Sequence, residues 1–465
     1  MASVALAPTE LGTEKIGKLL KMYAVPGIIA QTAASLYNMV DSIYIGHIPG
    51  VGSAAISGLA VTFPLMNLAT AMGTLVGVGA TTLISVLLGQ KNYDTARRVL
   101  SNVLSLNLII GALFSGVTLA FLDPILRFFG ASDVTLPFAR DYMLIILIGN
   151  VFTHLYFGFN GLIRASGHPK TAMGLTLFTV ISNAVLDPVF IFVFEMGIRG
   201  AALATVICQM AALVYTMKFF LDKKNLLHFP KPMFQIDWRI AGQSLAIGLG
   251  PFLMNSAACL VALFINQQLG KYGGDLAIGA YGIVNRLTML FIMICMGFNQ
   301  GLQPIAGYNY GARQYHRVKD VFMLTAKWET LVTSLCFLMA ELIPGLAVSL
   351  FTNDPGMIEM ASKALRILCA GTALVGFSIT TSTLFQCLGM VKKSIFLSLS
   401  RQLIFLLPLI YSLPMWFQEK GVWMSFPIAD MLSVAVAFVF VQRLFKKFDK
   451  LKDGQDAGAL GSAIK

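Results

Sequence analysis

Charged residues are scarce in this sequence. Asp, Glu, Lys and Arg make up 12% of its 465 residues, hydrophobic residues make up 57%, and the mean hydropathy is +0.75. A soluble globular domain carries about twice that share of charge. The composition therefore excludes the soluble class and predicts a polytopic membrane protein.

The sequence also lacks the motifs of a catalytic centre or a metal site. Its six cysteines form no CxxC pair and fall in apolar segments, so we expect them to pack as small apolar residues. The five His residues are scattered, and no HExxH or GxSxG motif occurs. The first residues do not resemble a secretory signal, so the first helix is expected to be retained. We predict no enzyme activity and no cofactor.

Long apolar runs dominate instead. A helix needs about 20 apolar residues to cross about 30 Å of hydrocarbon. Such runs lie near residues 19–46, 55–86, 97–122, 134–160, 168–194, 199–221, 242–269, 276–304, 318–343, 357–387, 393–415 and 421–444. The sequence predicts an all-α polytopic membrane protein with twelve transmembrane helices.

The net charge of +12 is distributed over alternate loops. Of the 34 Lys and Arg residues, 25 lie on the side of the two termini, seven lie in the opposite loops, and Arg286 and Arg401 lie within spans. By the positive-inside rule both termini are cytoplasmic. This alternation argues against nucleic acid as a partner.

The two halves of the chain resemble each other. Shifting the second half by 222 residues aligns LGQKNY, residues 88–93, with YGARQY, residues 310–315, and Gly167 with Gly389. Six helices per copy make the repeat parallel, with a pseudo-twofold axis along the membrane normal. We expect an N-terminal six-helix lobe that holds a cation site, a cytoplasmic linker, a C-terminal six-helix lobe and a cytoplasmic tail. Their predicted ranges are 1–217, 218–241, 242–447 and 448–465.

Two acids interrupt the apolar spans of the first half. Asp41 lies in NMVDSIYIGH and Asp187 in SNAVLDPVF, where a carboxylate costs roughly 2.5 kcal/mol or more unless it has a partner. Asn183 lies one turn before Asp187 on the same helix face, Pro188 can kink that helix, and Thr205 lies at a similar depth on the next helix. Such oxygen groups suit H⁺ or Na⁺. The alternative is a carboxylate buried only for helix packing.

The second half lacks these acids. Near the start of the two halves the offset is 225 residues, a difference that fits in the loop after the first helix, and there Asn266 corresponds to Asp41. At the offset of 222, Leu409 corresponds to Asp187. Glu341 and Asp430 are weaker candidates, for which a role at a helix end or in packing is an equal alternative to a site. Arg286 is expected to hold the bundle through an ion pair or carbonyl contact, whereas Arg401 is expected to extend toward the cytoplasmic surface.

Aromatic, Met and amide side chains could line a cavity for bulky, varied substrates. The candidates, each of which could instead serve packing, are Gln31, Tyr37, Asn38, Phe63, Asn67, Met254, Asn255, Arg286, Met289, Met293 and Gln300.

With these features, the sequence resembles the multidrug and toxic compound extrusion (MATE) family over residues 15–445. The resemblance rests on NMVDSIYIG, on GQKNYDTAR after the second helix and on GLIRASGHP before the fifth. The spacing of Asn183, Asp187 and Thr205, together with Asp41, is similar to the N-lobe cation site of the prokaryotic DinF-type branch. The carboxylate that the NorM-type branch carries on the seventh helix is absent from MNSAACL, residues 254–260.

The resemblance implies a secondary exporter in the plasma (inner) membrane of a prokaryote. It would antiport organic, often cationic and amphiphilic compounds against inward H⁺ or Na⁺, in contact with membrane lipids and as a monomer. Asp41, Asn183, Asp187 and Thr205 would bind the coupling ion, and would be its metal ligands if it is Na⁺. A lipid-linked oligosaccharide flippase of the same superfamily is one alternative, although it would need a more cationic cavity. A membrane-embedded enzyme or a receptor is the alternative from a different class.

Overall fold

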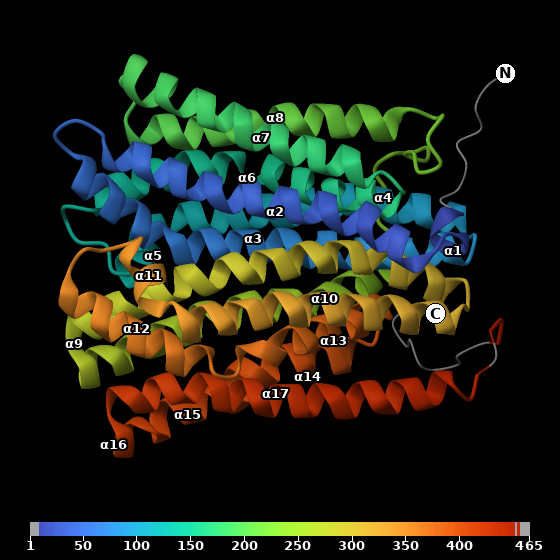
Figure 1. The fold of residues 1–465 in the computed structure, drawn as a ribbon. Coiled ribbons are helices and arrows are strands. Elements are labelled where there is room, and N and C mark those ends of the chain that lie inside the picture. The colour runs from blue at the N-terminus through green and yellow to red at the C-terminus, as the bar shows by residue number, and fades with distance from the viewer. Residues whose placement is uncertain (1–8, 452, 456–465) are drawn as a thin grey trace. The chain divides into compact units, whose positions relative to one another are not determined.

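The structure is a computed structural model that describes residues 9–451 and 453–455, apart from the side chains of Asn38, Met39, Ser53, Ile56 and Asp275. Within these residues the chain forms helices joined by turns and loops and contains no strand (Figure 1). This agrees with the all-α class predicted from the apolar runs.

Within its described residues, from residue 9 onward, the first half contains eight α-helices. They are α1 (Glu10–Thr13), α2 (Ile16–Gly46), α3 (Gly52–Gly89), α4 (Tyr93–Ala120), α5 (Leu122–Phe128), α6 (Leu136–Ala165), α7 (Pro169–Pro188) and α8 (Ile198–Leu221). A π-helical turn, Val189–Val193, continues α7.

The second half begins with α9 (Trp238–Gly311), in which Gly274 has the non-helical angles φ 69° and ψ −169°. The helices that follow are α10 (Tyr315–Leu342), α11 (Pro344–Ser349), α12 (Pro355–Cys369), α13 (Val375–Cys387), α14 (Val391–Leu399), α15 (Leu407–Ser412), α16 (Pro414–Phe417) and α17 (Glu419–Phe448). A 3₁₀ turn, Thr372–Leu374, precedes α13, and a π-helical segment, Ser400–Leu406, joins α14 to α15.

The helices account for the twelve predicted spans. Ten described segments are long and apolar enough to cross a membrane, with α9 counted as two because it breaks at Gly274. An eleventh span is formed by α12 and α13, which are bent by 48° at their junction. The remaining predicted span, 19–46, corresponds to α2, which is not among these apolar segments but whose 31 residues exceed the length that a bilayer requires. The chain is thus a multi-pass membrane protein.

The chain forms two compact units, and two of its helices contribute to both. Unit 1 consists mainly of Ile29–Phe252, whereas unit 2 contains Glu14–Ile28 and the chain from Leu253 onward. The start of α2 therefore belongs to unit 2, and the start of α9 belongs to unit 1. The lobe boundaries expected from the sequence, 217/218 and 241/242, remain a prediction.

Helix boundaries repeat at the offset of 222 residues. The first and last residues of α4, Tyr93 and Ala120, correspond to those of α10, Tyr315 and Leu342. The turns before these two helices both contain a non-glycine residue with φ 58°, at Lys91 and at Arg313. Residues 222 apart therefore occupy equivalent places in the two copies.

Glycine brings helix backbones together within unit 1. A Cβ on Gly79 of α3 would lie 1.8 Å from the carbonyl oxygen of Ser244 on α9, and a Cβ on Gly248 would lie 1.8 Å from that of Leu75. Small residues are the usual means of packing helices in lipid, where apolar surface gains little by leaving one oily medium for another.

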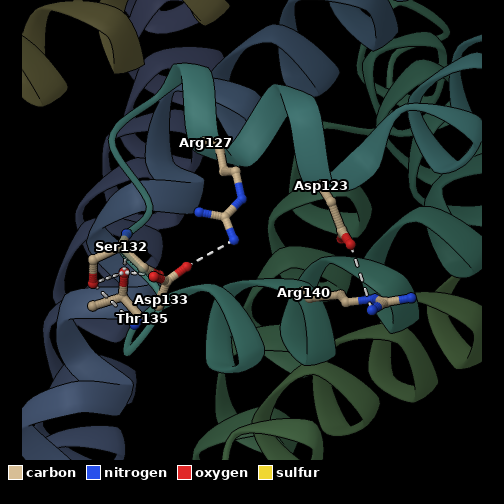
Figure 2. Close-up of polar contacts among 6 residues, drawn as sticks. All are labelled: Asp123, Arg127, Ser132, Asp133, Thr135 and Arg140. Atoms are coloured by element: carbon tan, nitrogen blue, oxygen red, sulfur yellow. Dashed lines mark hydrogen bonds and ion pairs between the residues drawn. The ribbon is translucent and has the colours of Figure 1, made fainter.

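Polar contacts fix the turn between α5 and α6 in unit 1. Arg127 donates to Asp133 at 2.8 Å, and Ser132 and Thr135 bond each other across the turn, as Figure 2 shows. Arg140 and Asp123 form a longer ion pair of 3.5 Å between the same two helices. These charges are solvent-exposed, so each pair contributes less than about 1 kcal/mol.

Candidate functional site

Asn183 and Asp187 form the buried centre of a polar cluster in unit 1. Both lie on α7, one turn apart, and are 4% and 0% exposed. The Asn183 amide Nδ2 donates to Asp187 Oδ1 at 2.6 Å. Pro188 follows, and because it has no N–H to donate, the regular hydrogen-bond pattern of α7 ends there and a π-helical turn begins.

Thr205 of α8 completes the sequence-predicted group on that side. Its hydroxyl donates to Asn183 Oδ1 at 3.1 Å and also contacts the carbonyl of Ala201. With the carbonyl end of the Asn183 amide engaged in this way, the NH₂ end must face Asp187. Thr205 therefore orients the group that bonds the carboxylate.

Helix α2 supplies two more groups. The Tyr37 hydroxyl donates to Asp187 Oδ2 at 3.1 Å, so both oxygens of Asp187 accept a hydrogen bond. Asp41 is 7% exposed, its carboxyl interacts with that of Asp187, and its Oδ1 has no hydrogen-bond partner. The structure thus brings all four predicted cation-site residues together.

The two acids of the cluster have no positively charged partner among the described residues. No described Lys or Arg forms an ion pair with Asp41 or Asp187. Two neighbouring carboxylates in a low-dielectric interior do not both ionise without a counter-charge. The unpartnered Asp41 oxygen is therefore a position at which a proton or a small cation would be stabilised.

The types of ligand atom in the cluster limit which cation it could bind. The described residues contain no group of three or more His, Cys, Asp or Glu side chains that could hold a metal ion. A Na⁺ ion would need the amide and hydroxyl oxygens of Asn183, Thr205 and Tyr37 besides the two carboxylates. Oxygen ligands of this kind fit a hard monovalent cation or a proton and do not fit a transition metal.

Tyr37 is the member of this cluster that was expected elsewhere, among the substrate-cavity residues. Tyr142 of α6, which is 4% exposed, also interacts electrostatically with both acids. Tyr37 precedes Asp41 by four residues, so helical periodicity places it on the same face of α2 and could have indicated its position. No sequence pattern indicates the position of Tyr142.

The remaining cavity candidates keep accessible surface. Phe63, Arg286 and Met289 are exposed, and Gln31, Asn67, Met254, Asn255, Met293 and Gln300 are partly exposed. The side chain of Asn38 lies outside the described residues. These side chains are therefore not enclosed in helix packing, and their role in a substrate cavity remains a prediction.

Asp430, for which a site and a packing role were equal alternatives, is bonded to a cation in unit 2. It is 1% exposed and accepts from Arg401 Nε at 2.5 Å, and the Arg401 side chain keeps 32% of its surface exposed. Glu341 lies beside Arg366 in the lining of an open hollow of about 400 Å³. Glu329 of α10, which was not among the predicted site residues, is 0% exposed.

Known proteins resemble this chain along nearly its whole length. The MatE family model matches residues 26–189 and 251–412. The multidrug export protein MepA of Staphylococcus aureus (strain N315) is 29% identical over 427 residues, which cover 92% of this chain and 94% of that protein. MepA of Staphylococcus haemolyticus (strain JCSC1435) is 28% identical over 429 residues, with the same coverage.

Solved structures of transporters are also similar to this chain along nearly its whole length. The MATE multidrug transporter DinF-BH is 35% identical, with a TM-score of 0.86 over 95% of this chain and 98% of that one. A MATE protein in the bent conformation is 23% identical, with a TM-score of 0.90 over 96% and 99%, and shows the shared fold. MepA and DinF-BH are named as multidrug transporters and not as enzymes, in agreement with the prediction of no enzyme activity. The chain belongs to the multidrug and toxic compound extrusion (MATE) family.

Proposed function

We propose that this chain is a secondary multidrug exporter that expels organic, cationic and amphiphilic compounds in exchange for inward H⁺ or Na⁺. The names of the MepA and DinF-BH relatives support multidrug export. The proposal on coupling rests on one observation, the enclosed Asp41–Asp187 pair with an unpartnered carboxylate oxygen.

The coupling step follows from electrostatics. When a cation binds, it neutralises the negative charge of the Asp41–Asp187 pair. The hydrogen bonds that Tyr37 and Asn183 donate to Asp187 then stabilise a smaller negative charge. A ligand shifts a conformational equilibrium only by its difference in affinity for the two states. The cation therefore favours the state in which the pair is enclosed, and its release to the cytoplasm resets the transporter.

The test is export of a fluorescent organic cation from proteoliposomes under an imposed proton or Na⁺ gradient. We expect Asp41→Asn and Asp187→Asn to lose at least about tenfold in rate, because an amide is neutral and cannot exchange charge. Asp133→Asn is the matched control, since that acid is exposed in the α5–α6 turn (Figure 2). Unchanged export in both site variants would refute the proposed coupling site.

The two gradients identify the ion. Dependence on the proton gradient alone assigns the site to H⁺, and dependence on the Na⁺ gradient alone assigns it to Na⁺. Chemical conversion of the compound without any ion gradient would instead contradict the proposal that the protein is an exporter.

The location and partners complete the proposal. We infer a prokaryotic plasma membrane, cytoplasmic termini, a lipid environment and a functional monomer. Substituted-cysteine labelling at Lys91 and Lys392, both expected to be cytoplasmic, tests the topology, because an impermeant reagent should reach them only from inside.

A further inference from the structure

The same two positions are close together in both sequence repeats. In unit 1, Asn107 of α4 lies against Gly158 of α6, where an added Cβ would lie 2.7 Å from the Asn107 amide nitrogen. Residues 222 positions later are Glu329 of α10 and Thr380 of α13, which are hydrogen-bonded. The second copy thus carries an acid where the first carries an amide.

Glu329 is incompletely satisfied. It is 0% exposed, and its Oε2 accepts from the Thr380 hydroxyl at 2.8 Å. Its other oxygen, Oε1, has no hydrogen-bond partner. No described Lys or Arg forms an ion pair with it.

The groups around Glu329 are otherwise uncharged. Cys295 of α9 is the titratable side chain that interacts with it from the neighbouring helix, and it is also fully buried. Thr333, one turn along α10, bonds the backbone carbonyl of Glu329. On α13, Gly376 approaches the Glu329 backbone so closely that a Cβ would lie 2.5 Å from it.

An ionised carboxylate with one hydroxyl partner in this setting carries a large desolvation penalty. Binding of a proton removes the charge of the carboxylate, and a single carboxylate oxygen is enough to bind a proton. A metal cation needs several oxygen ligands, whereas the one side chain bonded to the Glu329 carboxylate among the described residues is Thr380, through a single hydroxyl. The proton is therefore the ligand that fits.

We propose that Glu329 is a proton-binding site of unit 2, separate from the Asp41–Asp187 pair. A hydronium ion transfers its proton to the carboxylate and leaves as water, giving the neutral acid. Since Glu329 is enclosed between α10 and α13, exchange with water requires these helices to part near Gly376.

Infrared spectroscopy tests this site without a transport assay. Purified protein carrying Asp41→Asn and Asp187→Asn is titrated with pH, and the carbonyl band of protonated carboxylic acids is compared with that of the same protein carrying Glu329→Gln. We expect a band that is lost in the Glu329→Gln protein and that weakens as pH rises. The unaltered Asp41 and Asp187 are absent from this background, so failure of the coupling proposal does not affect the result.

Thr380 supplies a second measurement that leaves the acid in place. Its hydroxyl stabilises the ionised form, so in Thr380→Val the band should persist to higher pH, by about one pH unit. Thr380→Ser should behave as the wild type, and Glu359→Gln, at an exposed acid, should change nothing.

Three results would overturn the proposal. A Glu329 band of constant intensity over the whole pH range would mean a permanently protonated packing residue. The absence of any band specific to Glu329 would mean that it never binds a proton. Loss of the band on adding Na⁺ would reassign the site to a metal cation.

Discussion

The Asn183 amide reaches Asp187 Oδ1 at 2.6 Å across a single turn of α7. Because residues four apart share a helix face, this contact forms whenever α7 is helical. The orientation of the Asn183 amide, however, is set by another helix, since an amide can present either its NH₂ group or its carbonyl oxygen to a neighbour. Thr205 decides between them by donating to the carbonyl.

Thr205→Val should therefore impair export while preserving the fold. Valine keeps the shape of threonine and removes the hydroxyl, which frees the Asn183 amide to rotate. A lost neutral hydrogen bond is worth about 1 kcal/mol, so the export rate should fall about fivefold in proteoliposomes. Thr205→Ser, which keeps the hydroxyl, should restore the rate, and equal losses in both variants would contradict this orienting role.

Sequence alone could locate the helices and could predict that Asp41, Asn183, Asp187 and Thr205 lie close together. Helix length follows from the span of apolar residues, and the Asn183–Asp187 contact follows from helical periodicity. The approach of Asp41 was expected because two isolated acids in apolar helices need partners or a cation.

Contacts between residues that are far apart in the sequence could not be predicted in this way, because they depend on tertiary packing. Glu329 lies inside the predicted span 318–343, so the rule that singled out Asp41 and Asp187 could also have found it. Its close packing against Gly376 of a distant helix could not be predicted. Arg401 and Asp430 each look unpaired along the sequence, because they are 29 residues apart and lie on different helical segments.

Gly248→Ala should destabilise unit 1. The new Cβ would lie 1.8 Å from the Leu75 carbonyl oxygen, so α3 and α9 would have to separate. Overpacking of this kind costs typically about 1–3 kcal/mol, measured as a lower midpoint of thermal unfolding in detergent. Gly242→Ala is the control on the same helix, because nothing lies within 4 Å of its Cβ position. Equal midpoints for the two variants would argue against close packing at Gly248.

Breaking the Arg401–Asp430 pair should cost more than losing both charges. Asp430→Asn leaves the guanidinium without its counter-charge, which costs about 3 kcal/mol for a largely buried pair. Adding Arg401→Met should recover much of the loss, since the remaining groups are neutral. Thermal unfolding of the two single variants and the double variant measures the coupling, and additive effects would contradict it. Glu359→Gln, which breaks an exposed pair with Lys363, should change stability by less than about 1 kcal/mol.

The first turn of α10 should depend on the C-terminal tail. Asn92 caps α4 by accepting from the Thr95 backbone, but Gln314, its equivalent in the second repeat, makes no side-chain cap. Asp453 takes that place, since its carboxylate accepts from the Tyr315 backbone N–H at 3.0 Å. A lost cap costs about 1 kcal/mol, so in Asp453→Ala the first-turn amides of α10 should exchange hydrogen about fivefold faster.

Asp449→Ala is the matched control for this change. Asp449 follows the last residue of α17, and its side chain bonds the exposed Lys319 side chain at 3.0 Å and does not contact the backbone amides of the first turn of α10. A surface ion pair contributes little, so its loss should leave exchange at the start of α10 unchanged. Equal protection of these amides in Asp453→Ala and in the wild type would show that the tail carboxylate does not hold the helix end, whereas faster exchange in both variants would mean that docking of the whole tail, and not the cap, protects it.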